Sequence, residues 1–223
     1  MLLAVLVGAL LTAAAVTVRW TLTRVDVLGR RRSFPVVGTA VPLVLALVAG
    51  VPVVRHARAE ARLARAASVL AGYDVRIRCE TLTQAWTSAH AELGYVRFGA
   101  DGRPEPVATL TSDACSDLTA WLDRPRADAP LAQLVAVHVL THEAMHLRGI
   151  TDEARTECAA VQRDAVTATL LGAPAGQGQP LARRYWRIAY PDLPDAYRTS
   201  ECAPGEALDE GLADAPWAPV KSS

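Results

Sequence analysis

Two long stretches without a single charged residue constrain this chain more than any other feature of its sequence. Residues 1–18 and residues 35–54 are each close to the ~20 apolar residues that a helix needs to cross a bilayer. The second stretch also contains glycine and proline, which are more frequent in membrane helices than in soluble ones. The first lacks the basic start and the clear cleavage site of a signal peptide. We therefore predict two membrane-spanning helices, which form a hairpin over residues 1–54.

The charges around these stretches favour one orientation of the hairpin only slightly. Five arginines and one aspartate lie between the stretches, whereas four arginines and one glutamate follow the second. The positive-inside rule therefore favours a cytoplasmic loop, which places both termini outside.

Four cysteines support the same orientation. Cys79, Cys115, Cys158 and Cys202 all follow the apolar stretches. An even number of widely spaced cysteines is typical of disulfides formed in an oxidising compartment. We therefore predict two disulfides and an extracytoplasmic C-terminal domain on a multi-pass protein of the cell membrane. Four cysteines allow three pairings, and we expect Cys158 to pair with Cys202 or Cys115.

The remainder of the chain divides into three segments. Residues 55–70 are rich in arginine and alanine and predict a juxtamembrane helix. Residues 71–205 form the main domain. The chain after residue 190 is rich in proline, aspartate and glycine, and residues 206–223 are predicted to be an irregular tail. The formal net charge is +0, which gives no basic field for nucleic acid, so the lipid bilayer is the partner that we expect.

The fold class predicted for the main domain is α+β, mainly helical with a small sheet. Alternating residues predict a strand at 73–79, and an Asp-Gly turn joins two hairpin arms at 95–98 and 107–110. Pro104 and Pro106 favour an edge position for the second arm. Helical patterns cover residues 83–93, 112–122, 131–148, 151–171 and 181–190.

The motif HExxH lies within the helix predicted over residues 131–148. His142 and His146 are four residues apart and share one helix face, so both imidazoles could reach one metal ion. Neutral imidazole suits Zn²⁺, which catalytic sites hold with three protein ligands and a water. Glu143 is placed to take a proton from that water as it attacks a peptide bond. We predict Zn²⁺ as the cofactor, the two histidines as ligands and Glu143 as the catalytic base.

Residues 141–158 resemble the zincin superfamily of zinc metallopeptidases. The resemblance implies a zincin-like fold, in which zinc lies between two helices beneath a small sheet. Gluzincins take their third ligand from a second helix, in a pattern like NExxAD. Residues 152–157, Asp-Glu-Ala-Arg-Thr-Glu, resemble that pattern, and the resemblance implies Glu153 as the ligand and Glu157 as the outer acid.

Three carboxylates compete for the place of third ligand. Glu153 is favoured, because a chain reversal at the glycine after the motif brings Glu153 level with His146 and Glu157 level with His142. Glu157 could then accept the second ring N–H of His142 and fix its tautomer, or could itself be the ligand. The pattern HExxHxxGxxD resembles metzincins instead, and it makes Asp152 the ligand.

His138 lies on the same helix face as the two motif histidines. It is about 12 Å from His146 along a straight helix, too far for both to bind one ion. We expect His138 in a supporting or solvent-facing position, with stabilisation of the transition state as its alternative role. Zincins often use a tyrosine, histidine or arginine for that role, so Tyr185, Tyr190 and Tyr197 are further candidates, although we expect a structural role for each.

These features together predict a membrane-anchored, zinc-dependent peptidase-like protein. It would hydrolyse peptide bonds of a peptide or protein that the sequence does not identify. One alternative is a zinc-binding protein without catalytic activity that mediates interactions in the cell envelope. The other is a structural membrane protein in which the motif is fortuitous.

Overall fold

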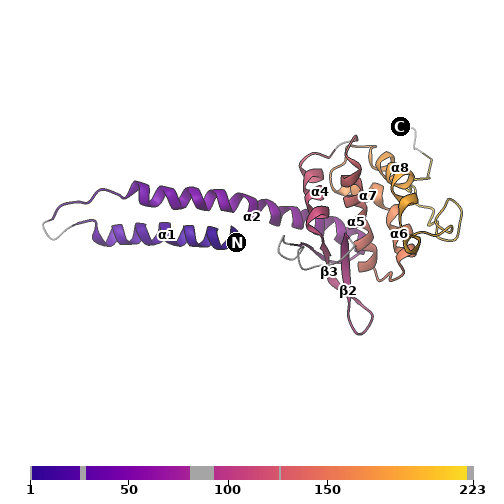
Figure 1. Ribbon diagram of the computed structural model, residues 1–223, viewed down its shortest axis with the longest axis horizontal. Helices are drawn as coiled ribbons and strands as arrows, with labels where there is room; N and C mark the ends of the chain where they lie inside the picture. Colours follow the sequence, from indigo (N-terminus) through magenta and orange to yellow (C-terminus); the bar gives the residue numbers. More distant parts are fainter. Residues whose placement is uncertain (1, 26–28, 81–92, 126, 220–223) are drawn as a thin grey trace. The chain divides into compact units, whose positions relative to one another are not determined.

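The computed structural model describes residues 2–25, 29–80, 93–125 and 127–219 (Figure 1). The chain divides into two compact units, Met1–Arg58 and Ala59–Ser223. The helix predicted at residues 83–93 falls almost wholly outside the described residues.

Two long apolar helices lie at the start of the chain, as predicted. Helix α1 is Leu2–Thr23 and helix α2 is Val36–Ala71. Their most apolar windows have mean hydropathies of 2.1 and 2.3, so both helices are long and apolar enough to cross a membrane. Helix α2 runs without a break through the predicted juxtamembrane helix and ends before Gly72, which has a φ of +87°.

Within the first unit, α1 and α2 pack through small side chains. The buried residues on the two helices include the alanines Ala9, Ala13, Ala46 and Ala49. A Cβ added to Gly50 would lie 3.4 Å from the Leu6 side chain. Small residues let two helix backbones approach closely, and the larger valine and leucine side chains are left on the outer faces.

A three-stranded sheet opens the second unit, with strands β1 (Arg76–Cys79), β2 (Gly94–Phe98) and β3 (Pro104–Leu110). Its order is β1-β3-β2, with β1 parallel and β2 antiparallel to β3. The prediction that the second hairpin arm lies at an edge is therefore wrong. Among the residues that the structure describes, strand β1 pairs with residues 107–110. Pro104 and Pro106, which lack an N–H, therefore precede that ladder.

The helices after the sheet are α4 (Ser112–Asp123), α5 (Leu131–Leu147), α6 (Glu153–Val161), α7 (Asp164–Leu170) and α8 (Gly178–Ile188). The single helix predicted over residues 151–171 is wrong, because a turn separates α6 from α7. The buried side chain of Gln162 donates to the Leu208 carbonyl (2.9 Å) and accepts from the Glu210 amide (2.8 Å). These contacts with the C-terminal segment outweigh local helix propensity.

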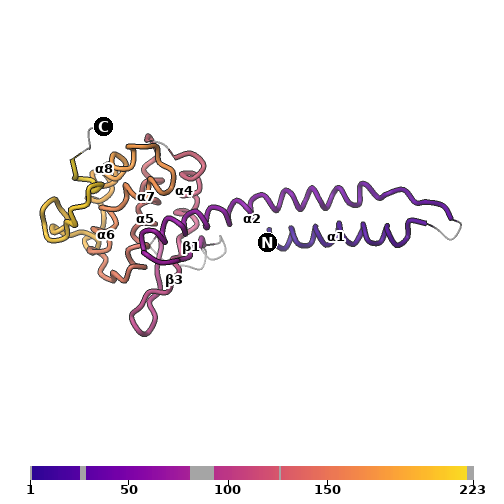
Figure 2. Tube along the Cα trace, turned by 180° about the vertical axis from the view of Figure 1, so that it is seen from behind, coloured from indigo at the N-terminus to yellow at the C-terminus, as the bar shows by residue number. Residues whose placement is uncertain are grey.

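Helix α5 is the central element of the second unit. Twelve of its 17 residues are buried, which is expected of a helix enclosed on all sides rather than on one face. It contacts β2, β3, α4, α6, α7 and α8. The last turns of α2 also belong to this unit, beside β1 (Figure 2), where Glu60 accepts from the Cys79 amide (2.9 Å). The HExxH residues therefore lie on the most enclosed helix of the unit.

Two disulfides join parts of this unit, as predicted. Cys79 in β1 pairs with Cys115 in α4, and Cys158 in α6 pairs with Cys202 in the C-terminal segment. Of the two partners expected for Cys158, the structure has Cys202. The second disulfide attaches the mainly irregular segment after α8 to the helix that follows the motif.

Candidate metal centre

The candidate centre lies where α5 ends and α6 begins. Gly149 follows α5 with a φ of +94°, a conformation that glycine adopts readily, and the chain reverses there. Asp152 then caps α6, since its carboxylate accepts from the Arg155 amide (2.9 Å). The tight turn places Glu153, the first residue of α6, opposite His142 and His146.

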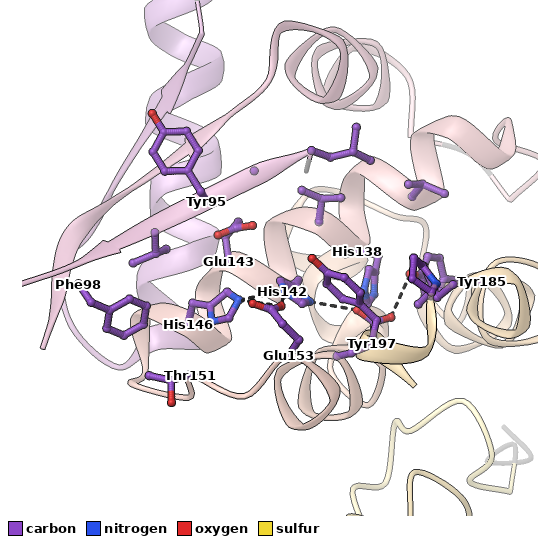
Figure 3. A pocket seen from close by; sticks show the side chains of 18 residues that line it. Tyr95, Phe98, His138, His142, Glu143, His146, Thr151, Glu153, Tyr185 and Tyr197 are labelled. Carbon is purple, nitrogen blue, oxygen red and sulfur yellow. Dashed lines mark hydrogen bonds and ion pairs between the residues drawn. The ribbon is translucent and has the colours of Figure 1, made fainter. Parts of the chain in front are cut away.

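Three donor atoms from these residues converge (Figure 3). The Nε2 atoms of His142 and His146 are 3.0 Å apart, and Glu153 Oε2 lies 3.1 Å from the first and 3.4 Å from the second. Ligand atoms at tetrahedral zinc distances would be separated by about 3.3–3.6 Å. The three atoms therefore form a triangle close in size to one face of a zinc tetrahedron.

The other ring nitrogens of the two histidines have defined partners. His146 Nδ1 donates to the Ile150 carbonyl (2.7 Å), and His142 Nδ1 lies 3.0 Å from Glu157 Oε2. In the neutral tautomers that donate these bonds, both Nε2 atoms carry a lone pair beside Glu153 Oε2. Lone pairs this close to one another repel unless a cation lies between them, so the donor set fits a metal ion.

The electrostatic field at this point also favours a cation. Burial lowers the pKa of His142, but the carboxylates of Glu153, Glu157 and Glu143 outweigh burial and raise it to about 9. Hydrogen bonding to His142 in turn lowers the pKa of Glu153. A positive charge, whether a proton or a metal ion, is therefore stabilised here.

Glu157 lies behind the triangle rather than in it. Its Oε2 contacts His138 Nε2 (2.8 Å) as well as His142 Nδ1, and its Oε1 accepts from the Tyr185 hydroxyl (3.1 Å). Burial opposes its negative charge, but the two histidines outweigh burial and lower its pKa to about 2. Glu157 therefore holds His142 as a carboxylate, in the position expected of the outer acid.

His138 is enclosed rather than directed at a substrate. Its Nδ1 lies 2.9 Å from Asp164 Oδ2 and its Nε2 faces Glu157, while its ring stacks on Tyr185 at 4.0 Å. Burial lowers the pKa of His138, but the two carboxylates outweigh it and raise the pKa to about 10. Both ring nitrogens of His138 thus face carboxylates, although the residue also lines the pocket described below.

Glu143 lies against strand β2. A Cβ added to Gly94 would come within 2.8 Å of Glu143 Oε1 and 2.9 Å of the Leu110 side chain. Gly94 therefore leaves room for the carboxylate, a role that is not among those predicted from the sequence. A glycine at the start of a strand is the signal that could have pointed to it, since such glycines often mark a close approach.

A pocket of about 710 Å³ opens beside these residues. Its walls come from β2, α5, α6, Tyr185 of α8 and residues 193–197. Tyr197 lines it, with its ring 5.9 Å from that of His142. Tyr185 donates to Glu157, and Tyr190 donates to the Thr199 carbonyl (3.5 Å). Of the three tyrosines, Tyr197 has its ring beside a motif histidine on the pocket wall, whereas the Tyr185 ring stacks on His138.

Comparison of the chain with known protein families, curated proteins and solved structures finds no match. The resemblance to zincins therefore rests on the sequence of residues 141–158 alone.

Proposed function

We propose that this protein is a membrane-anchored, zinc-dependent peptidase of the zincin type. His142, His146 and Glu153 would hold the ion, and Glu143 would act as the base. The observation that carries the proposal is the convergence of three donor atoms, all within 3.4 Å of one another, on the wall of a pocket that Glu143 also lines.

The pocket residues supply the rest of the chemistry. When bound, Zn²⁺ lowers the pKa of a water and polarises a carbonyl oxygen. The Glu143 carboxylate, buried and adjacent in sequence to His142, takes a proton from the attacking water and delivers it to the leaving amine. The pocket volume lies within the range of small-ligand sites, which suits a short peptide segment.

Tyr197 is the residue to which we assign stabilisation of the oxyanion. It lies over His142 on the pocket wall, and a phenolic O–H directed at the developing charge lowers the barrier. His138 and Tyr185 do not suit this role, because their polar atoms contact buried carboxylates.

The proposed location follows from the two apolar helices at the start of the chain and from the disulfides of the second unit. Two helices able to cross a bilayer precede the second unit, and that unit contains two disulfides. Disulfides persist in oxidising compartments. We therefore place the second unit outside the cytoplasm, with the bilayer as partner and a peptide or protein as substrate.

The test uses the full chain in detergent, with zinc content measured by elemental analysis and hydrolysis by a library of quenched fluorescent peptides. We expect one zinc per chain and cleavage of a subset of peptides. Glu143→Gln should retain zinc and lose at least ~100-fold in rate, as removal of a general base does. Asp152→Asn is the matched control, because asparagine also caps a helix, and it should retain both properties.

The other outcomes separate the alternatives. Stoichiometric zinc with unchanged cleavage in Glu143→Gln, or with no cleavage by the wild type, would indicate a zinc-binding protein without this catalytic activity. No zinc at neutral pH would remove both metal-dependent functions and leave a structural membrane protein.

A further inference from the structure

A buried histidine–aspartate pair lies behind the metal centre, on the side away from Glu153. We propose that Asp164 and His138 are positioning residues that fix the Glu157 carboxylate and thereby present His142 Nε2 to the metal. The inference rests on the proposed zinc binding but not on peptidase activity.

The pair forms a continuous chain of contacts with the proposed ligand. Asp164 Oδ2 lies 2.9 Å from His138 Nδ1, His138 Nε2 lies 2.8 Å from Glu157 Oε2, and the same oxygen lies 3.0 Å from His142 Nδ1. One oxygen atom therefore serves both histidines. Any shift of Glu157 that follows a change at His138 must alter the hydrogen bond to His142.

The packing around Glu157 makes the position of its carboxylate depend on His138. Its second oxygen accepts from Tyr185, and the Tyr185 ring stacks on His138 with an angle of only 14° between the rings. The side chains of His138, Glu157 and Asp164 are 3–5% exposed. Water therefore cannot readily replace a lost partner, and an unpaired carboxylate at this depth is costly.

A histidine is suited to this place for a geometric reason. Its two nitrogens lie on opposite sides of the ring, so one protonated side chain can donate to two carboxylates at once. Glutamine carries both donor hydrogens on one nitrogen, and it could serve Glu157 or Asp164 but not both. His138→Gln should therefore release the Glu157 carboxylate. It also removes the ring that stacks on Tyr185, whereas Asp164→Asn leaves that ring in place.

The first measurement is zinc affinity, by competition with a chelator, on the full chain in detergent below the unfolding temperature of every variant. We expect His138→Gln to weaken zinc binding about tenfold, as loss of a supporting partner does. Asp164→Asn should weaken it in the same direction, and it replaces His138→Gln if that variant does not fold. Thr167→Val is the matched control, because Thr167 joins α7 to α5 through Thr141 (2.8 Å), and it should bind zinc as the wild type does.

The second measurement needs no metal. The ring N–H of His142 that faces Glu157 should give a slowly exchanging proton resonance in the metal-free protein, assigned by its loss in His142→Gln. We expect this resonance to disappear in His138→Gln and to persist in Thr167→Val.

The two measurements distinguish this inference from the proposed function. A wild type that binds zinc but cleaves no peptide would contradict the proposed peptidase activity. Zinc affinity would then still test the positioning role of Asp164 and His138. A wild type that binds no zinc would contradict the proposed function. The resonance alone would then decide whether His138 and Asp164 hold Glu157 against His142. The inference is overturned if His138→Gln and Asp164→Asn bind zinc within twofold of Thr167→Val, or retain the resonance in a chain that binds no zinc.

Discussion

Gly94 determines how closely strand β2 approaches the Glu143 carboxylate. A Cβ at this position would lie 2.8 Å from Glu143 Oε1, and the carboxylate is the flexible partner that would move. We expect Gly94→Ala to retain zinc, because the three donor atoms lie elsewhere, and to lose at least ~10-fold in hydrolysis, because the base is displaced. Zinc content and the rate on one cleaved peptide measure the two effects.

Gly99 offers a matched control for this substitution. A Cβ there would also lie 2.8 Å from a carboxylate oxygen, that of Asp101, but on the exposed turn after β2. Gly99→Ala should therefore leave hydrolysis unchanged. Equal rates in the two variants would show that the approach of β2 to Glu143 does not matter for the reaction.

The residues of the centre differ in how far the sequence predicts them. His142, Glu143 and His146 follow from a local spacing on one helix, and Glu153 and Glu157 follow from the reversal after α5. Asp164 lies 26 residues from His138, and Gly94 lies in another element altogether. The role of Asp164 arises from tertiary packing, which no local pattern encodes. Gly94 carries only the general signal of a glycine in a strand, which does not name Glu143 as its neighbour.

At the level of elements, the turn between α5 and α6 sets the distance from the histidines to Glu153. Gly149 has a φ of +94°, where a Cβ is strained but contacts nothing within 4 Å. Gly149→Ala should lower the free energy of unfolding by roughly 1–2 kcal/mol and weaken zinc binding severalfold, because the turn must relax. Chemical denaturation and chelator competition measure the two quantities.

Gly176, in the loop before α8, has a φ of +74° and equally open surroundings. Gly176→Ala should lose similar stability but bind zinc as the wild type does. If both variants bound zinc equally well, the turn at Gly149 would not be what holds Glu153 in place.

Elements were predicted best where one local pattern decides them. The apolar helices, the hairpin arms and α5 agree with their patterns. The break between α6 and α7 does not, because it depends on bonds from Gln162 to Leu208 and Glu210, more than 40 residues away. The central position of β3 in the sheet was also not predicted. It depends on the pairing of β1 with β3, whereas the prediction was based on the prolines of β3.

On the scale of the whole molecule, the disulfides make stability depend on the redox state of the compartment in which the chain folds. They close loops with sequence separations of 36 and 44 residues, and loop entropy assigns each about 4 kcal/mol. A domain of this size is stable by only ~5–15 kcal/mol in total. A chain that folds with both thiol pairs reduced would therefore keep little stability, which favours folding in an oxidising compartment.

The two disulfides close loops of similar length, but their loss should affect the candidate metal centre differently. Replacing either cysteine pair with alanines should lower the unfolding midpoint of the full chain by roughly 10 °C, which corresponds to about 4 kcal/mol for a unit of this size. Cys158–Cys202 also attaches the segment that carries Tyr197 to α6, next to Glu157. Loss of this pair should slow hydrolysis even where the protein is fully folded.

Cys79–Cys115 joins β1 to α4, and neither cysteine lines the pocket. Its replacement should therefore cost stability alone, with the hydrolysis rate of the folded protein unchanged. If both replacements slowed hydrolysis equally, the effect would reflect general loosening of the unit. A difference between them would instead connect the C-terminal segment to the reaction through Tyr197, because that segment is what the Cys158–Cys202 bond holds in place.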